Sequence, residues 1–251
     1  PGGLTQNLLT FMRSVYNVRS FLSLDTWRTI QQIDTKWGNR KIKASRDHLL
    51  MVSDIDRLNT SLYAFLGMNR ESSRKELEWD ILDLGRKFEQ ALFNIRLLQC
   101  FFVKKEKEAT EYELINVVLE SLQSRITYRY TFRDHLQLPL LFELLVFDNN
   151  YPKSLSYIID RIKRRIFSMP KISRTLSKTE MEKLMSEAQN LINMADGTLL
   201  SQHDNEENEY DRLAELLGKL NAILLKVHTI FNKAYFRHTA SPQQLYISSV
   251  L

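Results

Sequence analysis

The sequence predicts an all-α protein, a single-domain helical bundle of about eight helices. Only 7 glycines and 5 prolines interrupt its 251 residues, far fewer turn residues than a β-sandwich or an α/β protein of this length needs. Apolar side chains recur at spacings of three and four along most of the chain, which is the period of an amphipathic helix. The connections between the periodic segments are short, and short connections favour antiparallel neighbours in a bundle.

The first three expected helices cover residues 4–20, 24–37 and 43–66. The second begins after Ser23, and serine caps helix N-termini by accepting a hydrogen bond from a backbone N–H. Gly67 is expected to end the third helix, because glycine is the commonest residue just past a helix C-terminus.

The fourth expected helix, residues 74–103, has the most regular apolar stripe. Gly85 lies inside it, where glycine costs about 1 kcal/mol relative to alanine, so we expect another helix to approach closely there. Cys100 lies in an apolar run of this segment and is expected to be a buried thiol. Trp27 and Trp79 fall on apolar faces and are expected to pack in the core.

The later helices are marked by their first residues. Pro139 and Pro152 each suit the first turn of a helix, where a missing N–H leaves no bond unmade. The segments expected in this half of the chain are 112–127, 139–147, 152–168, 177–200 and 204–231.

The periodic segments are expected to form one domain over residues 1–237, followed by a C-terminal tail over 238–251. A weak internal repeat has an offset of 151 residues and relates the helix at 4–20 to residues 155–171. Because helical periodicity matches itself easily, this echo indicates either chance or an internal duplication.

The charge balance is mildly basic, with a net charge of +5 and a pI of about 9.2. Basic clusters at 40–46 and 161–165 are expected on solvated helix faces, and nucleic-acid binding, which we do not expect, would need both clusters on one face. A single cysteine permits no internal disulfide and fits a reducing compartment, so the expected location is cytoplasmic. No apolar run approaches the roughly 20 residues that span a bilayer.

No sequence motif of a cofactor or metal site is present. The chain lacks a Gly-rich phosphate loop, a dinucleotide fingerprint, a His-Glu-x-x-His motif and a Gly-x-Ser-x-Gly motif. Its five histidines share no ligand spacing. We therefore expect no cofactor and no bound metal, and no catalytic residue can be named.

Three segments, 18–27, 79–91 and 142–155, carry the candidate functional residues, which are Arg19, Asp25, Arg86, Glu89, Asp148, Lys153 and Ser154. Arg86 and Glu89 are three apart and share a helix face. They indicate either a surface ion-pair ladder that includes Asp83, worth about 0.5 kcal/mol per pair, or a partly buried pair that ties helices together beside Gly85.

The third segment, residues 142–155, also has two interpretations, helix capping and anion binding. Asp148 is expected in a turn that caps the helix beginning at Pro152. Lys153 and Ser154 fall in the first turn of that helix, where free N–H groups could also hold an anion.

In this order and at these distances, the three segments resemble the alpha-E domain family of helical bacterial proteins over nearly the whole chain. The family pattern Leu-Gly-Arg-x-x-Glu-Arg-Ala is similar to residues 84–91, its Val-Arg-acidic pattern ending in Trp to 18–27, and its Asp-x-x-x-Pro-Arg-Ser pattern to 148–154. The chain departs from these patterns at Ser20 and Gln90. It also has Lys153 in place of an arginine, which loses bidentate geometry.

The resemblance implies a further N-terminal helix with a second copy of the motif, which this chain lacks, and it implies that the internal echo is a remnant of duplication. It carries no settled activity. Members of the family tend to be encoded beside, or fused to, ATP-grasp-type peptide-bond-forming enzymes and transglutaminase-like proteins. The resemblance therefore implies a protein partner of one of these kinds.

Two functions follow as hypotheses. The first is a non-enzymatic accessory domain serving an ATP-grasp-type peptide or amide ligase system, which predicts an exposed apolar patch larger than monomers usually show. The alternative is an enzyme with a carboxylate–arginine site acting on a peptide or amide substrate. It requires Arg19, Arg86, Glu89 and Asp148 to converge in one pocket.

Overall fold

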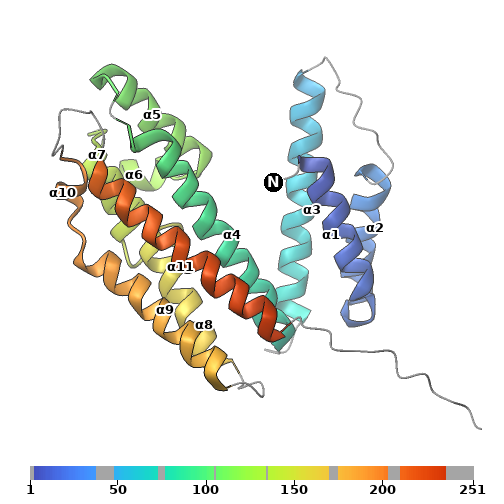
Figure 1. Cartoon of the computed structure of the whole chain (residues 1–251). Helices are drawn as coiled ribbons and strands as arrows, with labels where there is room; N and C mark the ends of the chain where they lie inside the picture. The colour runs from blue at the N-terminus through green and yellow to red at the C-terminus, as the bar shows by residue number, and fades with distance from the viewer. Residues whose placement is uncertain are drawn as a thin grey trace, which may run out of the picture. The chain divides into compact units, whose positions relative to one another are not determined.

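The computed structural model describes residues 3–37, 48–72, 77–104, 106–133, 135–169, 175–202 and 210–235. Within these ranges the chain forms eleven α-helices, a short 3₁₀ turn and a π-helical segment, and no β-strand. The all-α prediction is confirmed, with more helices than the expected eight. The chain divides into two compact units, which we call the N-terminal unit (Pro1–Asp80) and the C-terminal unit (Ile81–Leu251) (Figure 1).

The N-terminal unit is built from three helices, α1 (Leu4–Asn17), α2 (Leu24–Trp37) and α3 (His48–Ser72), with the 3₁₀ turn η1 (Arg19–Phe21) between the first two. Helix α2 packs against both α1 and α3. All three contribute to one apolar core, whose buried members are Leu8, Met12, Val15, Trp27, Ile30, Ile33, Leu58 and Phe65. The periodic positions Trp27, Ile30 and Ile33 are buried as expected, whereas Leu4, Val18 and Val52 are exposed.

Two predictions about helix ends in this unit can be compared with the structure, and one of them is confirmed. Ser23 Oγ accepts a hydrogen bond from Thr26 N at 3.2 Å, so it caps α2 as expected. The expectation that Gly67 ends the third helix is wrong, because α3 continues to Ser72. Nothing lies within 4 Å of a Cβ built on Gly67, and an interior glycine only weakens a helix.

The C-terminal unit contains the remaining helices, α4 (Leu77–Phe102), α5 (Glu108–Ser121), α6 (Arg125–Phe132), α7 (Leu138–Phe142), α8 (Leu155–Ser168), α9 (Thr175–Met194), α10 (Gly197–Leu200) and α11 (Asp211–Tyr235). The boundary between the units falls in the first turn of α4.

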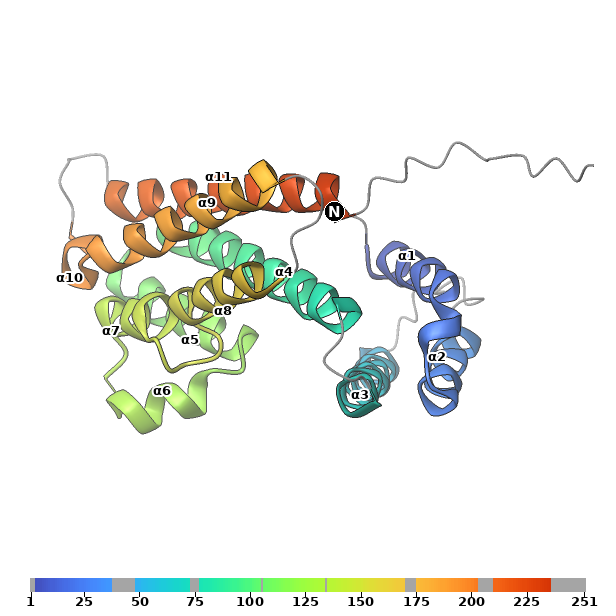
Figure 2. The ribbon, with the colours of Figure 1, turned by 90° about the horizontal axis from the view of Figure 1, so that it is seen from below.

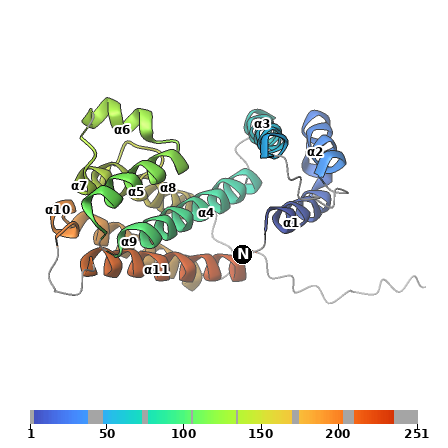
Figure 3. The same cartoon turned by 90° about the horizontal axis from the view of Figure 1, so that it is seen from above.

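In the C-terminal unit, α9 packs against both α8 and α11. Helix α4 runs alongside α11 (Figure 2), and the rings of Phe88 and His228 meet at 5.8 Å. Helix α6 lies at the edge of the unit, on the side away from α11, in both Figure 2 and Figure 3. Within α6, Tyr128 is fully buried, whereas Ile126 and Tyr130 are exposed.

A π-helical segment, η2 (Glu143–Phe147), continues α7, which begins with Pro139 near its N-terminus as expected. Asp148 N donates to Glu143 O at 2.9 Å, which is the i to i+5 bond of a π turn. The next helix begins at Leu155 rather than at Pro152, with Ser154 as its N-cap residue. The expectation that Pro152 starts this helix is therefore wrong.

Two expectations for α4 are also wrong. Cys100 is exposed, because the stripe through Leu98 and Phe102 turns that position outward. Gly85 is exposed, and nothing lies within 4 Å of a Cβ built on it, so no helix approaches it closely. Trp27 is buried as expected, whereas Trp79 is half-buried.

The expected helix at 112–127 is two helices, α5 and α6, that meet at a tight turn. Gln123 in this turn has a φ of 48°, a left-handed conformation that ends α5. Helices α1 and α8 have the same length of 14 residues, and they begin at Leu4 and Leu155. That agreement fits the internal duplication, which stays a prediction.

The expected single domain over 1–237 also stays a prediction, and the tail over 238–251 lies outside the described residues. So does the basic cluster at 40–46. Among the described helices, none combines the length and the apolar character that crossing a bilayer requires.

Candidate functional site

Three of the seven candidate residues lie in one turn, residues 148–154, between η2 and α8. Asp148 Oδ1 accepts hydrogen bonds from the backbone N–H groups of Asn150 at 2.7 Å and Tyr151 at 3.1 Å. The hydroxyl of Ser154 donates to Asp148 O and accepts from Tyr157 N at 3.0 Å, so it closes the turn and caps α8 at once. Asp148 and Ser154 therefore use their side-chain oxygens for hydrogen bonds within the turn and at the start of α8, as the capping interpretation predicts.

Lys153 fixes this turn to the end of α5. Its Nζ donates to the carbonyl oxygens of Leu122 and Gln123, which lie past the end of the helix and have no partner within it. The Leu122 oxygen also accepts a hydrogen bond from Ser124 Oγ at 3.2 Å. A cation is also favoured at the negative end of the helix dipole. Burial lowers the pKa of the Lys153 ammonium. In the buried layer beside it, Tyr151 Oη donates to Ser124 Oγ at 2.7 Å.

Two side chains of helix α4 donate hydrogen bonds to backbone oxygens of the same turn. Asn94 Nδ2 donates to Lys153 O at 2.7 Å, and Gln90 Nε2 donates to Pro152 O at 3.4 Å. The Asn94 side chain is fully buried, and its Oδ1 has no hydrogen-bond partner among the described residues. The 148–154 turn thus joins α4, the α5–α6 junction and α8 through polar contacts.

Of the two interpretations of Arg86 and Glu89, the ion pair with Asp83 describes Arg86, and the partly buried pair of Arg86 with Glu89 does not form. Arg86 Nη2 contacts Asp83 Oδ1 at 2.7 Å, and Arg165 Nη2, from α8, contacts Asp83 Oδ2 at 3.2 Å. Asp83 is 14% exposed. Burial acts to raise the pKa of its carboxyl, but the hydrogen bonds and charges of the two guanidinium groups outweigh burial and lower it. Asp83 joins α4 to α8 through Arg165, whereas Glu89 is exposed.

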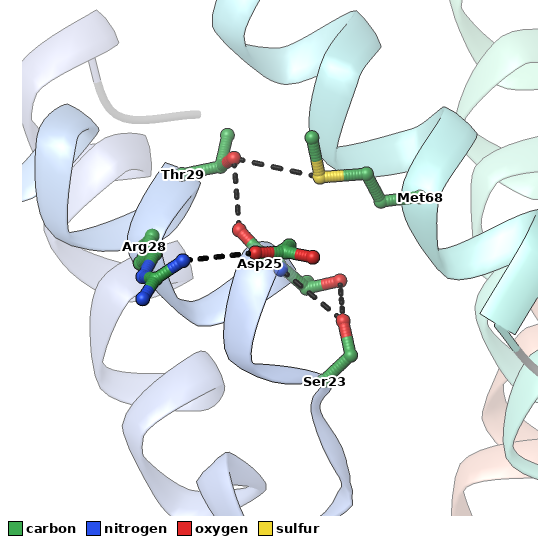
Figure 4. Close-up of polar contacts among 6 residues, drawn as sticks. Ser23, Asp25, Arg28, Thr29 and Met68 are labelled. Carbon is green, nitrogen blue, oxygen red and sulfur yellow. Dashed lines mark hydrogen bonds and ion pairs between the residues drawn. The ribbon is translucent and has the colours of Figure 1, made fainter.

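Arg19 and Asp25 belong to the N-terminal unit. The Arg19 guanidinium carbon lies 4.6 Å from the centroid of the Trp27 ring, a cation–π contact. Asp25 Oδ1 accepts from Arg28 Nη1 at 3.2 Å in a solvent-exposed pair (Figure 4). The same figure shows Thr29 Oγ1 donating to the backbone oxygen of Asp25 and approaching Met68 Sδ.

The seven candidates therefore have separate local roles where the structure describes their contacts. Asp148, Lys153 and Ser154 come together in one turn, while Arg86 and Glu89 occupy the exposed side of α4. The convergence of Arg19, Arg86, Glu89 and Asp148, which an enzyme would require, stays a prediction.

A second polar feature of the C-terminal unit was not identified in the sequence. A pocket of about 220 Å³ lies between α5 and α6, lined by Tyr112, Asn116, Leu119, Arg125, Tyr128, Arg129, Arg133 and Leu136. The three arginines are spaced by four residues, which places them along one side of a helix. This spacing can be read from the sequence, but the helix expected there ended at residue 127, so Arg129 and Arg133 were not grouped with Arg125.

The fold defines an all-helical protein, and its described residues hold no group of three His, Cys, Asp or Glu side chains placed to bind a metal. The chain belongs to the Alpha-E family, described as a predicted alpha-helical domain with a conserved ER motif, whose sequence model matches residues 1–236. Glu89 and Gln90 stand where the resembling pattern has Glu-Arg.

Relatives with curated sequences are similar at low identity. The chain is 24% identical over 237 residues to the uncharacterized proteins Rv2567 of Mycobacterium tuberculosis and Mb2597 of Mycobacterium bovis. The match covers 90% of this chain and 26% of each relative, so the chain spans about a quarter of their length. No solved structure matches this chain.

Proposed function

We propose that this protein is a non-catalytic accessory domain that docks onto a protein of an ATP-grasp-type peptide or amide ligase system. Membership of the Alpha-E family supports the proposal through the ligase neighbours that the family resemblance implies. The polar contacts of the candidate residues support it as well. Asp148, Lys153 and Ser154 close a turn and join helices, so their polar atoms are occupied in holding the fold.

The observation that carries the proposal is the outer face of α6. Ile126 is 86% exposed and Tyr130 is 91% exposed, and they lie one helical turn apart on the same side of the helix. A helix normally turns such side chains toward the core. Neighbouring exposed apolar residues of this size are typical of protein-binding surfaces, in which tyrosine is enriched at energetically dominant positions.

A binding measurement with matched variants tests the proposal. The full-length protein is mixed with an ATP-grasp-type peptide ligase from the same organism, and complex formation is followed by sedimentation velocity. The double variant Ile126→Asn with Tyr130→Asn removes the apolar pair from α6. The control, Leu24→Asn with Tyr63→Asn, removes two exposed apolar side chains, 63% and 68% exposed, from the N-terminal unit.

We expect a complex for the unaltered chain and the control, and at least a tenfold weaker complex for the α6 variant. Truncating a few central contacts commonly removes most of the binding energy. The absence of any complex with the unaltered chain would refute the proposal, as would peptide or amide turnover by this chain alone. The latter result would establish the alternative, an enzyme with a carboxylate–arginine site.

A further inference from the structure

Polar side chains of α4 and α8 meet along one line in the C-terminal unit, which we call the α4–α8 seam. Its members on α4 are spaced by four, three and four residues, and those on α8 by four, so each set lies on one side of its helix. The side chains of the seam are Asp83, Lys87, Gln90 and Asn94 from α4, and Tyr157, Arg161 and Arg165 from α8.

Both ends of the seam are closed by attractive contacts. At one end, Arg165 Nη2 contacts Asp83 Oδ2 at 3.2 Å. At the other end, Gln90 and Asn94 donate to backbone oxygens of the 148–154 turn, at 3.4 Å and 2.7 Å. Each end therefore joins opposite charges, or a donor to an acceptor.

The middle of the seam has a cation on each side. Lys87 Nζ lies 5.8 Å from the centroid of the Tyr157 ring, and the guanidinium carbon of Arg161 lies 5.9 Å from the same centroid. In the part of the chain that the structure describes, neither cation makes an ion pair, and Lys87 Nζ donates to the neutral Gln90 Oε1 at 3.0 Å. The ring attracts both cations weakly, but it does not neutralise them.

The surroundings of Lys87 disfavour its positive charge. The side chain is half-buried, and burial lowers the pKa of its ammonium. The charges of Arg86 and Arg161 lower this pKa further, while Asp83 acts in the opposite direction. Asp83 already contacts two guanidinium groups, those of Arg86 and Arg165. Its single charge therefore leaves the cations in the middle of the seam without a counter-charge.

An anion between the two helices would remove this repulsion, because like charges repel most strongly where water is partly excluded. A phosphoryl group carries close to two negative charges at neutral pH and three strong acceptor oxygens, which balance one lysine and one arginine. A carboxylate carries a single charge. Arg161 is exposed, so its guanidinium can turn toward a ligand held by Lys87. The charge balance therefore favours a phosphoryl group over a carboxylate.

We propose that Lys87 and Arg161 bind a phosphoryl group in the middle of the α4–α8 seam, either as inorganic phosphate or as part of a phosphomonoester. The lysine ammonium and the arginine guanidinium donate to oxygens of the same group, in charge-assisted hydrogen bonds. The site uses no residue of α6. The inference therefore goes beyond the proposed docking role and does not depend on it.

The test measures the melting temperature of the full-length chain at rising concentrations of inorganic phosphate, methyl phosphate or acetate. Sodium chloride holds the ionic strength constant. A ligand that binds only the folded protein raises the melting temperature, and the dependence on concentration gives the affinity. The seam variants are Lys87→Met, which keeps an aliphatic stem, and Arg161→Gln. The control, Arg164→Gln, removes the same charge from α8, where Arg164 pairs with Asp160 at 2.8 Å.

We expect inorganic phosphate to raise the melting temperature of the unaltered chain and of Arg164→Gln alike. Acetate should bind at least about tenfold more weakly, because it carries one charge. Each seam variant should lose about tenfold or more in phosphate affinity, since a charge-assisted hydrogen bond is removed. An equal response to methyl phosphate would identify a phosphomonoester as a ligand, and a response to inorganic phosphate alone would identify the free ion.

The seam variants have a second readout in the absence of any ligand. Each removes the repulsion between Lys87 and Arg161, so each should melt at or above the temperature of the unaltered chain. Residues with a purely structural role would instead lower the melting temperature when replaced. A phosphorus NMR titration adds a direct measurement, in which the phosphate signal should broaden with the unaltered chain and stay sharp with Arg161→Gln.

Three results would overturn the inference. The first is an equal phosphate response in the seam variants and in Arg164→Gln, because binding would then follow net charge alone. The second is the absence of any phosphate response in the unaltered chain beyond that of chloride. The third is acetate binding as tightly as phosphate, which would assign the two cations to a carboxylate.

Discussion

Lys153 Nζ donates a hydrogen bond to the backbone oxygen of Leu122, so a residue of the turn that precedes α8 closes the C-terminal end of α5. The two residues are 31 positions apart in the sequence. Through this contact the 148–154 turn is fixed to the α5–α6 junction. That junction sets where α6, with its arginines and its exposed apolar pair, leaves the bundle.

Removing the Lys153 amino group should destabilise the protein. Lys153→Met keeps an aliphatic stem but leaves the oxygens of Leu122 and Gln123 without this donor. We expect the free energy of unfolding in urea to fall by about 1–3 kcal/mol. Lys153→Arg, which keeps the charge and the donors, should lose less. A methionine variant as stable as the unaltered chain would show that the contact has no stabilising role.

The carboxyl of Asp83 should make stability depend on pH. Its pKa is lowered in the folded protein by Arg86 and Arg165, despite burial. The stabilisation is therefore present above the unfolded pKa of about 3.9 and is lost as pH falls through the lower folded value. Asp83→Asn should be less stable than the unaltered chain at pH 7, and the difference should shrink at pH 3.

The exposed pair of Asp25 and Arg28 provides the control for this experiment. Both side chains are more than 60% exposed, and such pairs are worth well under about 1 kcal/mol. Asp25→Asn should therefore change stability little at either pH. A gap between Asp83→Asn and the unaltered chain that stays constant from pH 7 to pH 3 would be inconsistent with the assigned ion pairs.

Gly85 should tolerate a larger side chain. A Cβ at this position meets nothing within 4 Å, and the residue is exposed in the middle of α4. Gly85→Ala should raise the free energy of unfolding by about 0.5–1 kcal/mol, because alanine has the higher helix propensity. A destabilised alanine variant would indicate a close neighbour at this surface.

Cys100 should react in the folded protein. The side chain is exposed on α4, so a water-soluble maleimide has access to it without denaturant. Mass spectrometry should show one label per chain under native conditions and none in Cys100→Ser. Labelling that appears only after unfolding would restore the buried thiol that its apolar sequence neighbours suggest.

Arg133→Gly should stabilise the protein. Glycine adopts the φ of 60° without strain, so the melting temperature should rise, with a gain in the free energy of unfolding of about 0.5–1 kcal/mol. A lower melting temperature for the glycine variant would contradict the strained backbone conformation assigned to Arg133.

The features that the sequence predicted correctly depend on neighbours within a few residues. Ser23 capping α2 and Pro139 opening α7 are local rules, and helical periodicity identified the buried stripes. The errors at Gly85 and Cys100 have a different origin. Periodicity along one helix shows that a stripe exists, but it does not show how closely a neighbouring helix approaches a given position or which flanking residue stays exposed.

The polar contacts of the site could not be predicted, because they join distant segments. Asn94 contacts Lys153 across 59 residues, and Arg165 reaches Asp83 across 82. No local pattern states which acid an arginine will choose, so the sequence left both Asp83 and Glu89 open as partners of Arg86, and only the structure assigns Asp83. The four-residue spacing of the arginines on α6 can be recognised in the sequence. The pocket that they line could not be predicted, because it forms only where α5 lies beside α6.

The measurement that tests the docking role most directly is hydrogen–deuterium exchange of the full-length protein, with and without an ATP-grasp-type peptide ligase from the same organism. We predict that amides of α6, Arg125–Phe132, exchange more slowly in the mixture, because the partner covers the face that carries Ile126 and Tyr130. Amides of α9 should be unchanged. Unaltered exchange in α6 at a partner concentration that forms a complex would contradict the account, because docking would then use another surface.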